Sequence, residues 1–473
     1  MALSSLKHRL ASWLASTLFA LLAGTIATAC AQGTRHEKAI STQDQQTLHQ
    51  ALDAYDRGDA NTAEPLLRLL NRKYPENYPA AEALGSLYVE AGKLDAALPL
   101  LRKACLLAPK ESLASANLGA AYLKLSRTPD AVRELRRAVA LDPYNAASQA
   151  SLAQALTLAG EMPAALTAYA AAAAADPDSA NLRYAWALAL YNNNAPAEAT
   201  EQLKQIPPAS WTDQMHVLAG DANERAGHFP EAIAEFEAAS RQNPSEDNLY
   251  ALTAELMRHW NWQEAVTVAN FASQKFPRTS RFRIAAGASL FGASDFKGAV
   301  QVFSALLAAD PANAVVADLL GRSCAALADG QFTGCEGLYQ YAEQHPGNPV
   351  MTTYAAIALL HAPGDAGTLV KAEALLRSAI AHNPKYAAAY MRLGTVQQAR
   401  QQWVESAASL ERAIALDPSS AEAHYRLSRA YAHLGRRDEA QQQNALRQSC
   451  EDQAKASINA RMQEVVRFVL TPG

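Results

Sequence analysis

The residues that most often do chemistry are present in this chain, but their spacing fits no known reaction or metal site. The eleven histidines are scattered, and neither a His-Glu-x-x-His segment nor a Cys-x-x-Cys pair occurs, so the spacing of a zinc site is missing. A glycine-rich phosphate loop and a Gly-x-Ser-x-Gly nucleophile elbow are missing as well. The sequence therefore predicts no catalytic residue, no cofactor and no metal.

The composition is that of a folded and mainly helical protein. Hydrophobic residues make up 49% and charged residues 19% of the 473 residues, and alanine, the strongest helix former, is abundant. This length exceeds one ordinary globular core, so it predicts several domains or a repeat array. The formal net charge of −4 argues against a nucleic-acid partner, which would need a basic surface.

The N-terminus has the features of an export signal. Lys7 and Arg9 lie in a short basic segment, and a mainly apolar stretch follows them. Small residues at alternate positions around Ala29 suit a signal peptidase. We therefore expect residues 1–31 to be a signal peptide and residues 32–43 a linker, and we expect the mature protein to be periplasmic or secreted.

Two other interpretations of this segment stay open. Cys30 could be the lipid-modified first residue of a lipoprotein, which would anchor the mature chain in the cell envelope. The apolar stretch could instead remain as an uncleaved anchor, although polar residues interrupt it. No later stretch is apolar enough to span a bilayer, so we expect no membrane span in the mature chain.

A repeat of about 34 residues organises the rest of the chain. Prolines recur at this spacing, each after an apolar stretch with helical character. Proline ends a helix because it lacks the N–H and disfavours helical geometry in the residue before it. The spacing predicts helical units that end at Pro75, Pro109, Pro143, Pro177, Pro244, Pro277, Pro311, Pro346, Pro384 and Pro418.

The residue types inside a unit are periodic too. In one unit Leu84, Gly85 and Tyr88 lie on a predicted first helix, Gly92 marks the turn, and a second helix ends at Pro109. The next unit has Leu118, Gly119, Tyr122 and Pro143 at the same positions, 34 residues later.

This pattern resembles the tetratricopeptide repeat, which has Leu-Gly and Tyr on helix A, and Ala, Phe and Pro on helix B. Leu often replaces Phe here, and no Trp opens helix A. The resemblance implies an all-α fold, a right-handed superhelical solenoid of about twelve antiparallel helix pairs over residues 44–454, with helix A on the concave face. We expect units to start near residues 44, 78, 112, 146, 180, 213, 246, 280, 314, 349, 387 and 421.

The resemblance also implies a concave surface that binds a protein or peptide. Some members of the family hold a C-terminal carboxylate with Lys and Asn on helix A of consecutive units. Asn117 and Lys124 have suitable positions in one unit, but Ala83 and Ser151 in the neighbouring units do not complete such a clamp. We keep Asn117 and Lys124 as candidate partner-binding residues without assigning that ligand.

Arginine and tyrosine gather on helix A of the last two units. Arg392, Tyr425, Arg426 and Arg429 fall where the concave face of the family would be, and these residue types are common at binding hot spots. The alternative is a solvated face whose charges nearby glutamates balance.

Two tryptophans stand close together at another turn. Trp262 has the position of a loop-anchoring apolar residue in other units, whereas Trp260 replaces the usual turn glycine and has no assigned role.

Cys324 and Cys335 are candidates for a disulfide. Cys324 lies on helix A, one turn after Gly321, and Cys335 takes a small-residue position on helix B, so both would face the partner helix across a short turn. An exported protein meets an oxidising environment, which permits the bond. The alternative is a pair of buried thiols that act as small apolar groups.

The end of the chain departs from the repeat. Asp452 stands where other units have the terminal proline, and apolar residues recur every three or four positions up to Val469. We expect helix B of the last unit to run on to about Leu470, with residues 455–473 as a capping extension. The alternative is a break near Glu451.

These observations favour an exported, non-catalytic scaffold or adaptor that binds a protein or peptide partner. An accessory subunit of a cell-envelope polysaccharide export or modification machine is a second hypothesis, which rests on analogy alone. An enzyme with an unrecognised site ranks below both.

Overall fold

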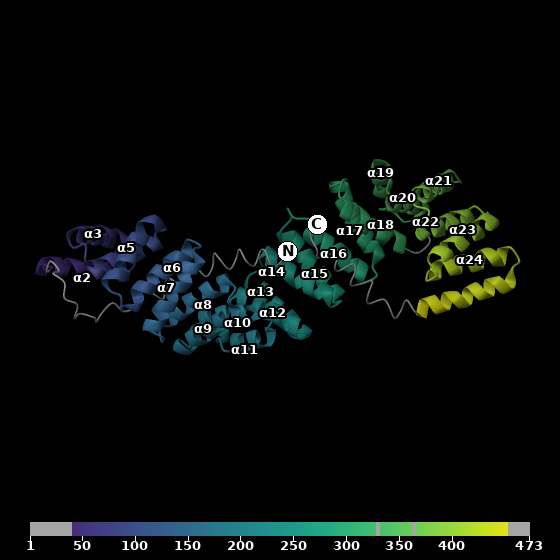
Figure 1. Cartoon of the computed structure of the whole chain (residues 1–473). Coiled ribbons are helices and arrows are strands. Elements are labelled where there is room, and N and C mark those ends of the chain that lie inside the picture. Colours follow the sequence, from purple (N-terminus) through teal and green to yellow (C-terminus); the bar gives the residue numbers. More distant parts are fainter. Residues whose placement is uncertain (1–39, 328–331, 362–365, 453–473) are drawn as a thin grey trace. The chain divides into compact units, whose positions relative to one another are not determined.

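The computed structural model describes residues 40–327, 332–361 and 366–452, and all regular structure within these ranges is helical (Figure 1). The chain divides into two compact units, the N-terminal unit Met1–Glu231 and the C-terminal unit Ala232–Gly473. None of the described helices combines the length and the hydropathy that crossing a membrane requires. The expected signal peptide, Cys30 and most of the expected linker lie outside the described residues.

Helix pairs make up the N-terminal unit. They are α2 (Thr42–Asp56) with α3 (Ala60–Lys73), α4 (Tyr78–Glu90) with α5 (Leu94–Leu107), α6 (Ser112–Lys124) with α7 (Thr128–Leu141), α8 (Ala146–Ala159) with α9 (Met162–Ala175), and α10 (Ala180–Asn192) with α11 (Pro196–Lys204). The 3-10 helix η2 (Pro208–Ser210) and α12 (Asp213–Ala226) follow.

The C-terminal unit continues the pattern after α13 (Phe229–Gln242), whose first turn contains the division between the units. Its pairs are α14 (Glu246–Arg258) with α15 (Trp262–Lys275), α16 (Arg281–Gly292) with α17 (Phe296–Ala309), α18 (Ala314–Ala326) with α19 (Gly337–Gln344), α20 (Pro349–His361) with α21 (Ala366–His382), and α22 (Ala387–Ala399) with α23 (Trp403–Leu416). The helix α24 (Ala421–His433) and helical residues 437–452 come last. The first helix of each pair begins within two residues of its predicted start, so the repeat predicted from the prolines is confirmed.

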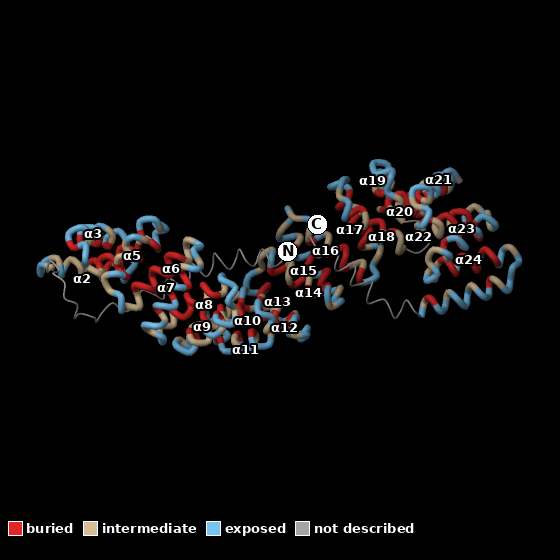
Figure 2. Tube along the Cα trace, in the orientation of Figure 1, coloured by how far each residue is buried: buried red, intermediate tan, exposed pale blue. Residues whose placement is uncertain are grey.

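The helices of each unit form two layers. A second helix packs against the first helix of its own pair and against the first helix of the next pair, and successive first helices also touch one another. We call the layer of first helices the A-helix layer. Buried residues lie along the sides where the helices meet, and exposed residues lie on their outer sides (Figure 2).

The small residue of the signature is required by close packing inside a pair. A Cβ on Gly85 would lie 2.7 Å from Cδ2 of Leu101, and a Cβ on Gly394 would lie 2.6 Å from Cγ of Leu410. The leucine of the second helix therefore occupies the space that any larger residue on the first helix would need.

The start of many first helices is fixed by the segment that follows the proline. Two residues after Pro75, the side chain of Asn77 caps α4 by accepting the backbone N–H of Ala80 at 2.9 Å. Ser420 does the same for α24, two residues after Pro418. Proline ends one helix and a polar cap begins the next, which accounts for the regular spacing.

The turn inside a pair needs one residue with left-handed backbone. Gly92 has φ of 71° there, and the next residue, Lys93, donates its backbone N–H to the carbonyl of Tyr88 at 2.8 Å, which caps the first helix. Trp260 and Gln401, both with φ of 62°, take the same position in their pairs. Trp260, whose role the sequence left open, is 38% exposed at its turn.

Trp262, at the start of α15, fits the expected role of a loop anchor. A Cβ on Gly292, the last residue of α16, would lie 2.6 Å from the indole ring of Trp262. The ring therefore packs closely against the end of the next first helix.

The pair α18 and α19 departs from the repeat. Cys335 was expected on the second helix, but this expectation is wrong, because Cys335 lies in the loop before α19 and that helix has only 8 residues. Gly334 has φ of 106°, which cannot continue a helix, and the backbone N–H of Phe332 donates to the carbonyl of His361 at 2.8 Å. These two features hold the segment away from helical geometry.

The last described helix runs without a break from residue 437 to residue 452, so it includes Glu451. The expected capping extension, residues 455–473, lies outside the described residues and stays a prediction.

The left-handed turn predicts a stabilising substitution. Gln401 is exposed, so Gln401→Gly removes little packing and relieves the backbone cost of a side chain at φ of 62°. We expect a gain of about 0.5–1 kcal/mol, measured as a higher urea midpoint. As a comparison, Ala374→Gly, at an exposed position in the interior of α21, should instead lose about 1 kcal/mol. Equal losses in both variants would contradict this account of the turn.

Candidate functional site

A groove lies on the A-helix layer of the C-terminal unit, between α18, α20 and α22. Its volume is about 340 Å³, and we call it the A-helix groove. Its floor is apolar, with Ile357 and Met391 among the lining residues. Its polar lining consists of Arg322, Thr353, Tyr354, Tyr386 and Arg392.

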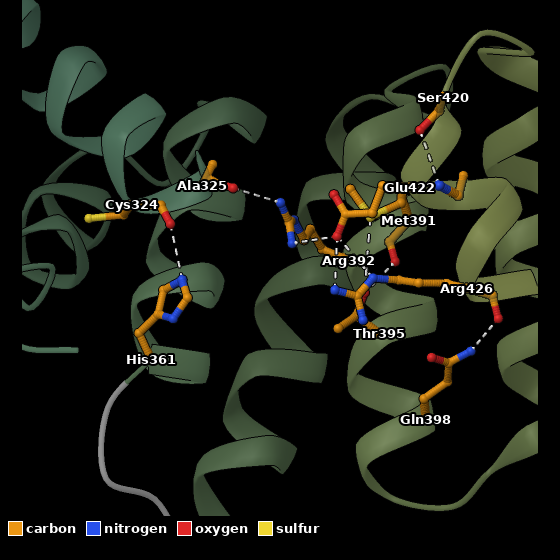
Figure 3. Close-up of polar contacts among 11 residues, drawn as sticks. Cys324, Ala325, His361, Met391, Arg392, Thr395, Gln398, Ser420, Glu422 and Arg426 are labelled. Carbon is orange, nitrogen blue, oxygen red and sulfur yellow. Dashed lines mark hydrogen bonds and ion pairs between the residues drawn. The ribbon is translucent and has the colours of Figure 1, made fainter. Parts of the chain in front are cut away.

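Arg392 is held in position from two sides (Figure 3). Its Nη1 lies 3.1 Å from Oε1 of Glu422 on α24, and its Nη2 donates to the carbonyl oxygen of Ala325 near the end of α18 at 3.0 Å. The side chain thus joins first helices that lie far apart in the sequence. A guanidinium fixed in this way loses little further conformational freedom when a ligand binds it.

The carboxylate that holds Arg392 is shared. Glu422 also accepts from Nε of Arg426 at 2.9 Å, and the Arg426 side chain is only 7% exposed. One carboxylate therefore faces two guanidinium groups, and it joins α24 to the Arg392 side chain on α22. Arg322, on the other side of the groove, donates from Nε to Oδ2 of Asp318 at 2.7 Å.

Two tyrosines form the aromatic part of the lining. A Cβ on Gly321 would overlap the ring of Tyr354, so the glycine lets this ring lie against α18. Burial raises the pKa of the Tyr354 phenol and of the Tyr386 phenol above the ordinary value of 10.0. Both hydroxyls therefore stay protonated at neutral pH and can donate hydrogen bonds.

The sequence also matches profiles of a known repeat family, in agreement with the repeat seen in the structure. Profiles of the tetratricopeptide repeat match residues 48–112, 116–180 and 250–314, and another profile of the same repeat matches residues 397–446, which together make up just over half of the chain. The chain belongs to the tetratricopeptide repeat family. No curated protein sequence matches the chain.

Several solved structures are similar to the chain. A structure titled as Naa15/Naa10 bound to HypK-THB has 14% identity and a TM-score of 0.37, covering 91% of this chain and 69% of that one. PilF of Pseudomonas aeruginosa has 16% identity and a TM-score of 0.39, over 43% of this chain and 92% of that one. YrrB, described as a TPR protein with an unusual peptide-binding site, has 18% identity and a TM-score of 0.36, over 40% and 97%. Likenesses this weak imply neither a shared partner nor a shared activity.

The structure brings only some of the predicted partner-binding residues together. Arg392 lines the A-helix groove, whereas Arg426, which binds the same carboxylate of Glu422, is itself buried. Tyr425 is 44% exposed on α24, with the guanidinium carbons of Arg429 and Arg447 at 6.0 and 5.9 Å from its ring centroid. A partner-binding role for these residues stays a prediction.

Asn117 and Lys124 lie in the N-terminal unit, and both have hydrogen-bond partners inside the array. The Asn117 amide is buried and donates to Glu82 and to Oγ of Ser86, the latter at 2.9 Å. The Lys124 ammonium donates to the carbonyl of Val89 at 3.1 Å. These contacts tie α6 to α4, so the two side chains do not form the open pair of donors that a clamp would present.

Four polar lining residues of the groove were not predicted from the sequence, namely Arg322, Thr353, Tyr354 and Tyr386. Tyr386 carries a usable signal, because it stands two residues after Pro384, where other tetratricopeptide units have a capping Asn or Ser. An aromatic residue at a capping position gives up the side-chain cap, which suggests that another role retains it.

Cys324 and Cys335 are joined by a disulfide, with the two sulfurs 2.06 Å apart and both residues buried. The carbonyl of Cys324 accepts a hydrogen bond from Nε2 of His361 at 3.0 Å (Figure 3). The next residue, Ala325, supplies the carbonyl that holds Arg392. The disulfide therefore fixes the end of α18 at the edge of the A-helix groove.

Removal of this disulfide should loosen the groove edge. The variant Cys324→Ser/Cys335→Ser is expected to lose about 2–3 kcal/mol, since the bond closes a short loop. Hydrogen exchange should rise mainly in α18 and α19, because neighbouring repeats are only locally coupled. The buried, unbonded Cys105→Ala is the control and should leave exchange in α18 and α19 unchanged. Unchanged exchange in α18 and α19 of the double variant would contradict a structural role.

Glu82 predicts a dependence of stability on pH. Burial raises the pKa of its carboxyl above the ordinary 4.5, although Ser86 and Asn117 donate to it. The folded state therefore favours the protonated form, and stability falls as pH rises from about 4.5 through the raised folded pKa.

Glu82→Gln removes this penalty at neutral pH while keeping a carbonyl oxygen that accepts from Ser86 and Asn117. We expect its melting temperature to exceed that of the wild type by about 2–4 °C near pH 8, and by less near pH 4. Glu76→Gln, at an exposed position, is the control and should change little at either pH. An equal decrease in the melting temperature of Glu82→Gln at both pH values would show that the charge of Glu82 does not cause the effect.

Proposed function

We propose that this chain is an exported, non-catalytic tetratricopeptide scaffold that binds a protein or peptide partner along the A-helix layer, with the A-helix groove as the main contact. The observation that carries the proposal is the arrangement of Arg392, held by Glu422 and by the Ala325 carbonyl, beside Tyr354 and Tyr386. These side chains present fixed donors and aromatic surface next to an apolar floor.

This combination suits an extended polypeptide. Backbone carbonyls and acidic side chains of a partner would accept from the guanidinium and phenol groups, and an apolar side chain would cover Ile357 and Met391.

Export is part of the proposal and is supported by the basic and apolar N-terminal segment and by the small residues around Ala29. Cys30 remains the position at which a lipid would be attached if the chain is a lipoprotein. Intact-mass measurement of the protein from the envelope fraction separates the cases, because cleavage, lipid attachment and an uncleaved segment give different masses.

Site-specific photo-crosslinking tests the groove directly. A benzoylphenylalanine in place of Tyr386 should give a defined crosslinked product in intact cells, and the same group in place of the exposed Tyr144 serves as the control position. With the partner identified and purified, Arg392→Ala should weaken binding about tenfold. Circular dichroism should stay unchanged, since Glu422 keeps Arg426 as its partner.

Arg392→Lys should recover little of the affinity, because an ammonium cannot reproduce the two-sided hold of the guanidinium. The proposal fails if no product depends on the Tyr386 position, or if Arg392→Ala binds the crosslinked partner as well as the wild type does.

A further inference from the structure

A second pocket lies on a different side of α22, between α21, α22 and α23. Its volume is about 390 Å³, and we call it the outer pocket. Tyr390 and Leu393 line it from α22, whereas the A-helix groove uses Met391 and Arg392 of the same helix. The two hollows share no lining residue, so a ligand in one leaves the other free.

The outer pocket is lined by two guanidinium groups and by no carboxylate. Arg377 is 61% exposed and is oriented by Glu373, whose Oε1 accepts from its Nη2 at 2.7 Å and from its Nε at 3.1 Å. Arg412, from α23, is exposed and has no ion-pair partner among the described residues. Glu373 also binds Arg400, so this carboxylate is already shared by two guanidiniums, and no carboxylate in the lining balances the charge of Arg412.

The rest of the lining limits the class of ligand that the two guanidinium groups can bind. Ile380 and Leu393 form an apolar floor, and the hydroxyl of Tyr390 has no hydrogen-bond partner among the described residues. A free oxyanion would accept hydrogen bonds from the guanidiniums and from the Tyr390 hydroxyl, but it would leave the apolar floor uncovered. A peptide segment with an acidic side chain next to an apolar one uses all three kinds of contact.

We propose that the outer pocket binds an acidic segment of a second protein, with a carboxylate between Arg377 and Arg412 and a neighbouring apolar side chain on Ile380 and Leu393. This site is independent of the A-helix groove, and it would let the array hold two polypeptides on opposite sides of α22.

The proposal is tested on the full chain with a fluorescein-labelled peptide of alternating Glu and Leu whose termini are blocked. Fluorescence polarisation should show saturable binding that weakens as salt rises, and a Gln-Leu peptide of equal length should not bind. Arg412→Ala should weaken binding about tenfold, and Arg377→Ala/Arg412→Ala should abolish it. Arg283→Ala, an exposed arginine of α16, is the charge-matched control and should bind like the wild type.

The outcomes separate this proposal from the function proposed above. If Arg412→Ala weakens binding of the Glu-Leu peptide and Arg392→Ala does not, the result supports the outer pocket, whatever the crosslinking at Tyr386 shows. If Arg392→Ala weakens binding and Arg412→Ala does not, the acidic peptide lies in the A-helix groove and the proposal is overturned. Equal losses in Arg412→Ala and Arg283→Ala indicate general charge attraction and also overturn it. Displacement of the peptide by inorganic phosphate at constant ionic strength, but not by acetate, reassigns the pocket to a free oxyanion and overturns it as well.

Discussion

In most helix pairs the chain reverses within two or three residues, and the rest of the architecture depends on that reversal. One residue takes left-handed backbone, and the following N–H returns to a carbonyl five residues earlier, as Lys93 does to Tyr88. This geometry sets the second helix against the first so closely that Leu101 fills the space above Gly85. A single pair still leaves apolar surface open, so the next pair has to cover it, and repetition places all first helices of a unit in one layer.

The A-helix groove lies where this regular reversal is interrupted. In the pair α18 and α19 the second helix is shortened to 8 residues, and a disulfide replaces the missing helical contacts at the end of α18. The carbonyl of Ala325 is thereby fixed at the point where Arg392 reaches it. The first helix of this irregular unit, α18, contributes Arg322 to the lining of the groove, whereas α20 contributes Tyr354 and α22 contributes Arg392. The groove is therefore built from first helices, and the irregular unit acts on it through the position of the Ala325 carbonyl.

The fold could be predicted from the sequence because its determinants are local. Proline and the turn residue act over a few residues, so their spacing predicted the start of every first helix within two residues. The site could be predicted only in part. Arg392 was identified from its position on helix A, but the partner of Asn117 stands 35 residues earlier on another helix, and no local pattern marks that contact. Cys335 was placed on the wrong element because the backbone of Gly334, at φ of 106°, is set by the packing of its loop and not by residue type alone.

The two hollows on α22 follow from the same helical geometry. Met391 and Arg392 lie on the side that faces the other first helices, and Tyr390 and Leu393 lie on the side that faces α21 and α23, because successive residues turn by about 100° around a helix. In a globular domain the second side would be buried in the core. In a stack of pairs the second helices cover it only partly, so one helix can contribute to two surfaces. The chemistry differs between them because the partners of the arginines differ: Glu422 and a backbone carbonyl hold Arg392 in place, whereas Arg412 has no described partner and keeps its charge available to a ligand.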